Sequence, residues 1–403
     1  MRLVMVLATL HCLAFIDRTM IGGVLPLMRD SVVMTDAQAG WIIGTAFALP
    51  YGVAALGLAA LRRGRPPSGG WLVVGVLLWT AGSFATGMAH SLGSLTLARA
   101  ALGIGQGIFV PLAIARLIDD TEPAGRSRAL GIFTGGATFG RSAALLTIGS
   151  LLTILGPLAA SSGVTAWRWL FIVTAVPNVL VLILLASNRA TPSAVHVASG
   201  PGRIGWRVLL PFFLVAVTPA LFAQAVLTWL PTLFVRERGL STVDAALLIG
   251  SITLVAAPAG PVIAGWLFGR FRHLEERMSL LVLLALAVTL LMLAALVHAG
   301  SLAGAVVSMA AMLVALGIAL FGGLFGVQLR TPPADRVSVN GVYLAFATLV
   351  AVGLGPLLAG SIATGTGQNG TALGTALIAT GGIATLACAL AVLVVAWTSR
   401  QST

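Results

Sequence analysis

The chain alternates long apolar stretches with short polar ones along its whole length. Hydropathy, glycine and proline positions predict twelve spans long enough to cross a bilayer core. They cover residues 3–28, 39–61, 71–90, 94–118, 129–153, 165–187, 206–233, 243–269, 278–298, 301–328, 341–364 and 371–397. Hydrocarbon offers the backbone no hydrogen-bond partner, so each span is expected to be a helix. The predicted fold class is an all-α polytopic membrane protein with 12 transmembrane helices.

Composition agrees with that pattern, because 58% of the 403 residues are hydrophobic and only 8% are charged. The net charge of +12 is typical of nucleic-acid-binding proteins until the arginines are placed on the predicted topology. With the N-terminus inside, 16 arginines fall in the inner loops and termini and four in the outer loops. This bias predicts cytoplasmic termini in a bacterial inner (plasma) membrane, with no nucleic-acid partner.

A Ser-, Pro- and Gly-rich stretch divides the spans six and six. We therefore predict an N-terminal six-helix bundle at 1–187, a cytoplasmic linker at 188–205 and a C-terminal six-helix bundle at 206–403. Short patterns recur between the halves at offsets of 206, 208 and 210 residues, for example Thr121 to Arg126 and Thr331 to Arg336. Two halves of the same orientation are typical of a transporter built from parallel repeats.

Four local patterns resemble signatures of the major facilitator superfamily, and the resemblance covers essentially the whole chain. They are the loop from Gly57 to Arg65, the stretch from Arg99 to Gly107, Trp167 to Phe171, and Gly353 to Pro356. The resemblance implies two bundles around a central cavity that transport by rocking between two faces. It also implies a cytoplasmic gate motif, here Gly57, Arg62, Arg63, Gly64, Arg65, Gly265 and Arg270. The aspartate of that motif is replaced by Leu61 and Gly269 in the two halves.

Within the superfamily, Asp17-Arg18, the segment from Thr35 to Gly40 and Trp229-Leu-Pro231 resemble spinster-like lipid transporters and the related anion:cation symporters. Spinster-like proteins usually carry glutamate at the position of Gln106. The resemblance implies a lysolipid-like or organic-acid substrate.

Asp17 is the only acidic residue more than two positions from the end of a predicted span. An ionised side chain at that depth costs about 3 kcal/mol and usually marks an ion or substrate pathway. Helical spacing places Arg99, Gly103 and Gln106 on one face, and Gly103 with Gly107 would admit a neighbouring helix, which the resemblance implies is the first. Asp17 is then either a proton carrier or one half of a static salt bridge.

Arg141 lies inside the fifth span, so three buried arginines face one carboxylate in the first half. An anionic substrate group is the natural partner for this excess, because the guanidinium fork suits carboxylate and phosphate. Alternatively, Arg141 bonds to backbone carbonyls or extends into water. His11 is expected to be hydrogen-bonded rather than a proton relay. The candidate proton-coupling residues are Asp17 and Arg18, and the candidate substrate-binding residues are Arg18, Arg99, Gln106, Arg141, Gln224 and Trp229.

The sequence contains no lysine-bearing phosphate loop and no metal-spaced His/Cys cluster, so we expect neither an enzyme nor a cofactor or metal. The predicted function is secondary active transport of an organic or amphipathic anion, coupled to protons through Asp17. The alternatives are a drug/proton antiporter, a passive uniporter and a non-transporting receptor. The expected partners are the substrate, protons and the bilayer, with the protein a monomer.

Overall fold

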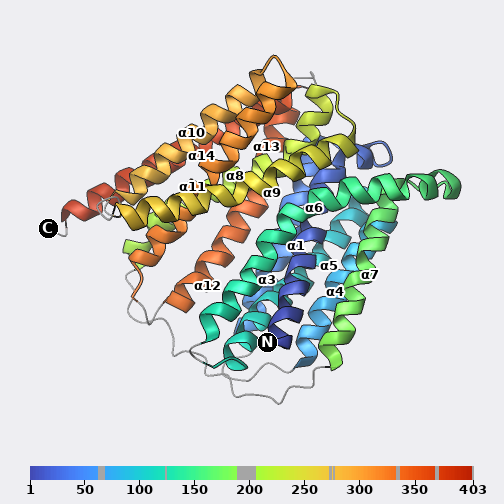
Figure 1. Cartoon of the computed structure of the whole chain (residues 1–403), viewed down its shortest axis with the longest axis horizontal. Coiled ribbons are helices and arrows are strands. Elements are labelled where there is room, and N and C mark those ends of the chain that lie inside the picture. Colours follow the sequence, from blue (N-terminus) through green and yellow to red (C-terminus); the bar gives the residue numbers. More distant parts are fainter. Residues whose placement is uncertain are drawn as a thin grey trace. The chain divides into compact units, whose positions relative to one another are not determined.

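The structure, a computed structural model, describes residues 1–61, 69–122, 125–187, 206–271, 275, 277–332, 336–367 and 372–401. Every regular element in those ranges is helical (Figure 1). Twelve of the helical segments are long and apolar enough to cross a membrane. The predicted fold class is therefore confirmed.

The first six spans are formed by eight elements. These are α1 (Arg2–Arg29), α2 (Asp36–Gly40), the π-helix η1 (Trp41–Thr45), α3 (Ala46–Leu61), α4 (Gly69–Met88), α5 (Leu92–Asp119), α6 (Arg126–Ser162) and α7 (Ala166–Ser187). Elements α2, η1 and α3 follow one another without a break and form the second span. The π-helical turn shifts the backbone register inside a membrane span, a distortion often found at functional sites.

The last six spans are also formed by eight elements. These are α8 (Trp206–Arg238), α9 (Thr242–Arg270), α10 (Met278–His298), α11 (Leu302–Leu329), α12 (Arg336–Ala347), the π-helix η5 (Thr348–Val352), α13 (Gly353–Gly365) and α14 (Ala372–Gln401). Helix α6 extends nine residues beyond the predicted end at 153, through Pro157. Proline is tolerated inside membrane helices, because neighbouring groups can bond the carbonyl that loses its intrahelical partner. Pro157 therefore did not mark the end of this helix.

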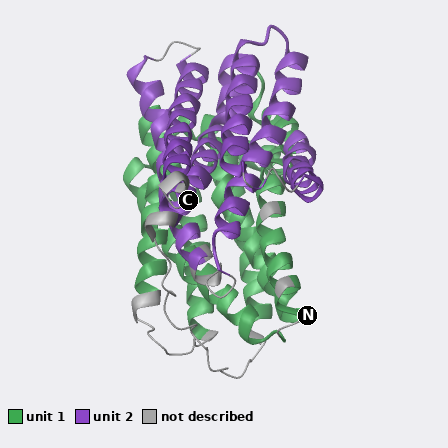
Figure 2. Ribbon diagram, turned by 90° about the vertical axis from the view of Figure 1, so that its left-hand side faces the viewer, with its two compact units in different colours: residues 1–197, 239–250 green, residues 198–238, 251–403 purple. Residues whose placement is uncertain are grey.

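The helices cluster into two compact units, coloured separately in Figure 2. Unit 1 comprises residues 1–197 and 239–250, and unit 2 comprises residues 198–238 and 251–403. The start of α9 belongs to unit 1 because it packs on α6, where a Cβ on Gly149 would lie 2.5 Å from Leu247 Cγ. The predicted linker at 188–205 lies outside the described residues, and the predicted domain boundaries stay a prediction.

Two glycines one turn apart bring α6 against α1 in unit 1. A Cβ on Gly136 would lie 2.4 Å from the carbonyl oxygen of Ala8, and one on Gly140 would lie 2.3 Å from that of Cys12. Only residues without a side chain permit so close an approach between helix backbones. This contact positions Arg141, the residue after Gly140, beside α1.

A second glycine pair brings α5 against the span that contains η1 and α3. A Cβ on Gly103 would lie 2.3 Å from the Phe47 carbonyl oxygen, and one on Gly107 would lie 2.5 Å from that of Tyr51. The expectation that these glycines receive the first helix is wrong, because their neighbour is α3. The close approach also places Arg99, one turn before Gly103, next to η1.

Each unit uses an arginine to satisfy carbonyl groups at the end of a neighbouring helix. In unit 1, Arg168 of α7 donates to the carbonyl oxygens of Gly87 and Ala89 at the end of α4. In unit 2, Arg238 of α8 donates to carbonyl oxygens at the end of α10, those of Leu296, Val297 and Ala299. A helix end leaves its last carbonyls without intrahelical partners, and positive charge there is favourable.

Candidate functional site

The carboxylate of Asp17 is enclosed by polar side chains of α4 and α7. Asp17 is 1% exposed, and Asn178 of α7 donates from its amide nitrogen to the carboxylate at 2.7 Å. Ser83 and Trp79 of α4 interact with the same carboxylate, although neither reaches the geometry of a full hydrogen bond. The acid therefore lies in a polar enclosure removed from water.

Arg99 is fully buried and is directed towards the π-helical turn. Its Nε donates to the Ile42 carbonyl oxygen at 3.3 Å, and Nη2 donates to that of Ile43 at 3.4 Å. Its Nη1 has no hydrogen-bond partner in the described structure, and its charge interacts with Asp17. Among the described residues, no arginine nitrogen lies within ion-pair distance of the Asp17 carboxylate.

The three arginines deep within the spans of unit 1 alternate with two phenyl rings. The guanidinium carbon of Arg141 lies 5.1 Å from the centroid of Phe15, and that of Arg18 lies 5.4 Å from the same ring. Arg18 also lies 4.6 Å from the centroid of Phe47, which Arg99 approaches at 5.3 Å. Cations over aromatic faces gain electrostatic stabilisation, so the rings partly offset the free-energy cost of removing these charges from water.

Arg18 and Arg141 differ from Arg99 in access and in bonding. Both are partly accessible, whereas Arg99 is not. Within the described part of the chain, neither Arg18 nor Arg141 forms a hydrogen bond or an ion pair. The alternative in which Arg141 bonds to backbone carbonyls is therefore not observed there. These two guanidinium groups keep their donors available for a ligand.

Asp17 and Arg18 are neighbours in sequence but face different surroundings. Consecutive residues on an α-helix point about 100° apart. Asp17 is therefore directed to α4 and α7, where Asn178 binds it, whereas Arg18 is directed to the aromatic rings that it shares with Arg141. Helix α1 thus separates a closed acidic compartment from a partly open cationic one.

Two further polar side chains connect α1 to its neighbours. Gln106 of α5 donates from Nε2 to the Ala14 carbonyl oxygen at 2.9 Å. Nδ1 of His11 lies 2.9 Å from the Phe133 carbonyl oxygen, and the two rings stack at 4.0 Å. His11 is thus hydrogen-bonded, as expected. The predicted role of Gln106 in substrate binding stays a prediction.

The other two candidate binding residues belong to unit 2. Trp229 of α8 is fully buried, and its Nε1 donates to the Pro356 carbonyl oxygen in α13 at 3.0 Å. Gln224, also in α8, is half-buried, and its Cβ lies beside Gly355. Trp229 therefore fixes α8 to α13, while the amide of Gln224 makes no hydrogen bond in the described structure.

The gate motif is described only in part. Arg62, Arg63, Gly64 and Arg65 lie outside the described residues. A Cβ on Gly57 would meet no atom within 4 Å, and one on Gly265 would lie 4.0 Å from Phe321 Cζ. The guanidinium carbon of Arg270 lies 5.9 Å from the ring centroid of Phe271. The gating role of these residues stays a prediction.

Sequence reasoning missed Asn178, Phe15 and Phe47. Asn178 offered a signal, because it is an amide near the middle of the membrane span Ala166–Leu185. The two phenylalanines offered none, since this residue type is common in membrane helices. In the part of the chain that the structure describes, no group of His, Cys, Asp and Glu could hold a metal ion.

Comparison with known proteins gives a family, several relatives and a fold. Residues 7–346 match the sequence model of the Major Facilitator Superfamily. The chain is 26% identical over 368 residues to an MFS-type efflux pump of Mycolicibacterium smegmatis, covering 89% of this chain and 83% of the relative. It is 32% identical over 261 residues to the puromycin resistance protein pur8 of Streptomyces alboniger, covering 63% of this chain but 46% of that protein.

A solved structure agrees with this chain over nearly its whole length. It is a bacterial homologue of the human lysosomal transporter Spinster, in an inward-facing and occupied conformation. The TM-score is 0.82 at 22% identity, with 98% of this chain and 96% of the other covered. At that identity the similarity establishes the fold only.

Proposed function

This chain belongs to the Major Facilitator Superfamily, whose members are multi-pass membrane transporters, and we propose that it is a proton-coupled transporter of an organic or amphipathic anion. Arg18 and Arg141 carry the proposal. Both lie within membrane spans, are partly accessible and have no carboxylate partner in the described structure. A buried cation without a counter-ion is unfavourable, so a carboxylate or phosphate of the substrate is the partner that the site lacks.

The enclosure of Asp17 supports coupling to protons. The carboxylate is held by the neutral Asn178 rather than by an arginine, so it can gain a proton without breaking an ion pair. Protonation would leave Arg18, Arg99 and Arg141 with no negative charge nearby, and the anion would then bind more tightly. Such linkage is reciprocal, so bound anion would favour the protonated acid. The proposed mode is therefore symport of proton and anion.

A second candidate is export of an organic molecule in exchange for protons. It is supported by two relatives, which are described as an efflux pump and as a puromycin resistance protein. The unpaired arginines of unit 1 favour an anion instead. The two candidates differ in the charge of the substrate and in the direction of the proton relative to it.

The test uses purified full-length protein, first in a thermal-shift screen and then in proteoliposomes. The screen compares lysophospholipids, sugar acids, aromatic acids and lipophilic cations. We expect anions to raise the unfolding temperature and lipophilic cations not to. A stabilising anion should then accumulate inside the proteoliposomes, against its own concentration gradient, when the proton gradient is directed inward. Stabilisation by cations alone, or accumulation only against an opposing proton gradient, would favour the exporter and reject the anion symporter.

A further inference from the structure

Unit 2 contains a cavity at the ends of four helices. Its volume is about 350 Å³, and its walls come from the start of α8 and α10 and the end of α11 and α14. Arg277 precedes the first residue of α10, and Arg330 follows the last residue of α11. The cavity therefore lies where these helices leave the membrane, on the face that the arginine bias predicts to be cytoplasmic.

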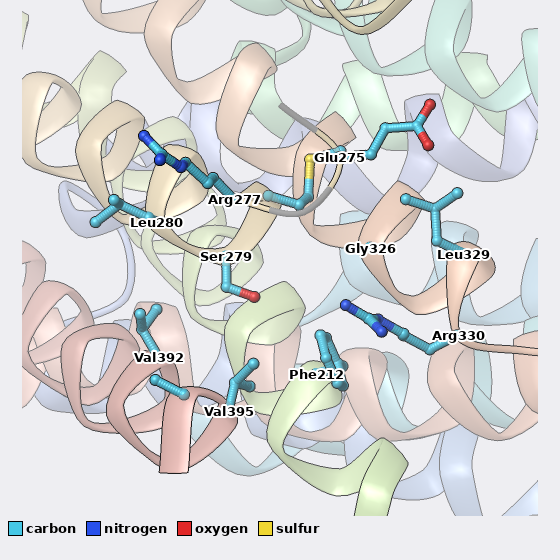
Figure 3. A pocket seen from close by; sticks show the side chains of 12 residues that line it. Phe212, Glu275, Arg277, Ser279, Leu280, Gly326, Leu329, Arg330, Val392 and Val395 are labelled. Carbon is cyan, nitrogen blue, oxygen red and sulfur yellow. The ribbon is translucent and has the colours of Figure 1, made fainter. Parts of the chain in front are cut away.

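The cavity combines cationic and hydroxyl groups with an apolar wall. Figure 3 shows the guanidinium of Arg330 over Phe212, with the hydroxyl of Ser279 across from it and Arg277 at the rim. The guanidinium carbon of Arg330 lies 5.2 Å from the Phe212 ring centroid. Val392 and other small apolar residues of α14 close the opposite side. A cavity with a polar end and an apolar wall suits an amphiphilic ligand.

The two arginines have no anionic partner within the described residues. Neither Arg277 nor Arg330 forms an ion pair there. Glu275 also lines the cavity, but its carboxylate is turned away from Ser279 and Arg330 (Figure 3). The guanidinium of Arg330 points towards Ser279 across the cavity (Figure 3), and a cation without a counter-ion there favours a phosphate, which accepts hydrogen bonds from both guanidinium and hydroxyl groups.

The wall of the cavity continues into the apolar surface of the membrane spans. Leu280 and Leu329 line the cavity and are 45% and 40% exposed. On α14, Leu393 and Trp397 flank the lining residues and are 65% and 61% exposed. An exposed apolar surface on a membrane helix faces acyl chains, and tryptophan is common at the depth of lipid headgroups. A molecule in the cavity can thus extend an alkyl chain along this surface.

We propose that this cavity binds an anionic phospholipid of the surrounding bilayer, with its phosphate against Arg330 and Ser279, its acyl chains along α10 and α14, and Arg277 adding positive charge at the rim. Basic pockets between membrane helices at the cytoplasmic side suit lipid headgroups of this kind. The site belongs to unit 2 alone and is independent of the transport site proposed in unit 1.

The test measures lipid retention by the full-length protein with native mass spectrometry. Phosphatidylglycerol is compared with phosphatidylcholine of the same acyl chains, since only the first carries a net negative charge. We expect the wild-type protein to retain phosphatidylglycerol, and the double variant Arg277→Gln/Arg330→Gln to bind it more weakly by about five-fold for each arginine. Equal retention of the two lipids by the wild-type protein would overturn the proposal.

The matched control is Arg2→Gln/Arg128→Gln, which removes two exposed arginines from the same predicted face in unit 1. This control should bind phosphatidylglycerol as the wild type does, and an equal loss would mean that net charge alone attracts the lipid. A second variant, Ser279→Leu, fills the cavity without changing charge and should also weaken retention. Full retention by Ser279→Leu would overturn the proposal. A rise in unfolding temperature with inorganic phosphate as large as that with phosphatidylglycerol would assign the cavity to a free anion instead.

Discussion

The two units use the same apolar helices but treat charge differently. In the described part of unit 1, four charged residues lie deep within membrane spans, namely Asp17, Arg18, Arg99 and Arg141. In the described part of unit 2, charged side chains occur near the ends of the helices, as with Arg238 and Arg330. Buried charge is costly, so its concentration in one unit indicates that this unit carries the charge-dependent chemistry.

The units also use their π-helical turns differently. In unit 1, the carbonyls of Ile42 and Ile43 in η1 accept hydrogen bonds from the charged Arg99. In unit 2, the neutral Trp229 donates to Pro356 in α13, the helix that follows η5. A charged side chain therefore binds the π-helical turn itself in unit 1, whereas in unit 2 a neutral ring binds the helix that follows the turn. Under the proposed mechanism we therefore expect protonation to affect unit 1 more than unit 2.

The largest effect is expected from Arg99→Ala. This change removes two hydrogen bonds to η1 and the cation nearest the closed acidic compartment, a loss of about 3–5 kcal/mol. We expect a much lower unfolding temperature in detergent and no measurable transport. Arg2→Ala, an exposed arginine of the same unit, is the control and should behave as wild type. Wild-type stability in Arg99→Ala would remove the proposed role of this residue in holding η1.

The next largest effect is expected from Asp17→Asn. Asparagine keeps the size of the side chain but cannot carry a proton between states. We expect no accumulation driven by a pH gradient, while substrate exchange across proteoliposomes continues, because exchange needs no net proton movement. The control is Asp30→Asn, which changes an exposed acid at the C-terminal end of α1. Asp17→Asn protein that still concentrates substrate would reject proton coupling through this residue.

A loss of stability would identify the other role of Asp17. If the acid mainly balances the buried arginines, Asp17→Asn should fold poorly, since it leaves positive charge unpaired. Size-exclusion chromatography and thermal unfolding separate this outcome from a folded protein that is only uncoupled.

A smaller effect is expected from Arg18→Gln and Arg141→Gln, tested one at a time. Each should weaken anion binding by at least about tenfold, because a hydrogen bond to a charged group contributes about 1.5–3 kcal/mol. The readout is the Kd from titration of the purified protein with the stabilising anion. Gln224→Ala tests the difference between the two units, because loss of this uncharged amide of unit 2 should change the Kd less than loss of Arg18 or Arg141. A larger effect of Gln224→Ala would place the main anion contact in unit 2.

The smallest effect on transport is expected from Arg168→Ala and Arg238→Ala. Each arginine satisfies carbonyl groups at a helix end, one in each unit. We expect both variants to lose about 2 kcal/mol of stability and to transport at the wild-type rate per folded molecule. Differential scanning fluorimetry and proteoliposome uptake measure the two quantities. A selective loss of transport in one variant would show that its helix end takes part in the transport cycle.

Sequence predicted the helices well and the contacts around the site poorly. The twelve spans follow from hydropathy, because a membrane helix must be apolar over a fixed length. Buried Asp17 and Arg99 could be recognised for the same reason, since charge at that depth is rare. The neighbour of Gly103 and Gly107 could not, because a small residue permits close packing without specifying which helix approaches.

The sequence by itself determined that this protein spans a membrane and holds Asp17, Arg18, Arg99 and Arg141 deep within the spans of its first half. Only the tertiary structure decided that Asp17 binds Asn178, that Arg99 binds the carbonyls of η1, and that Arg18 and Arg141 share the ring of Phe15. The physical reason is the distance along the chain over which each property is set. Hydropathy is a property of each segment alone, whereas the environment of a buried charge depends on side chains from helices that are distant in sequence.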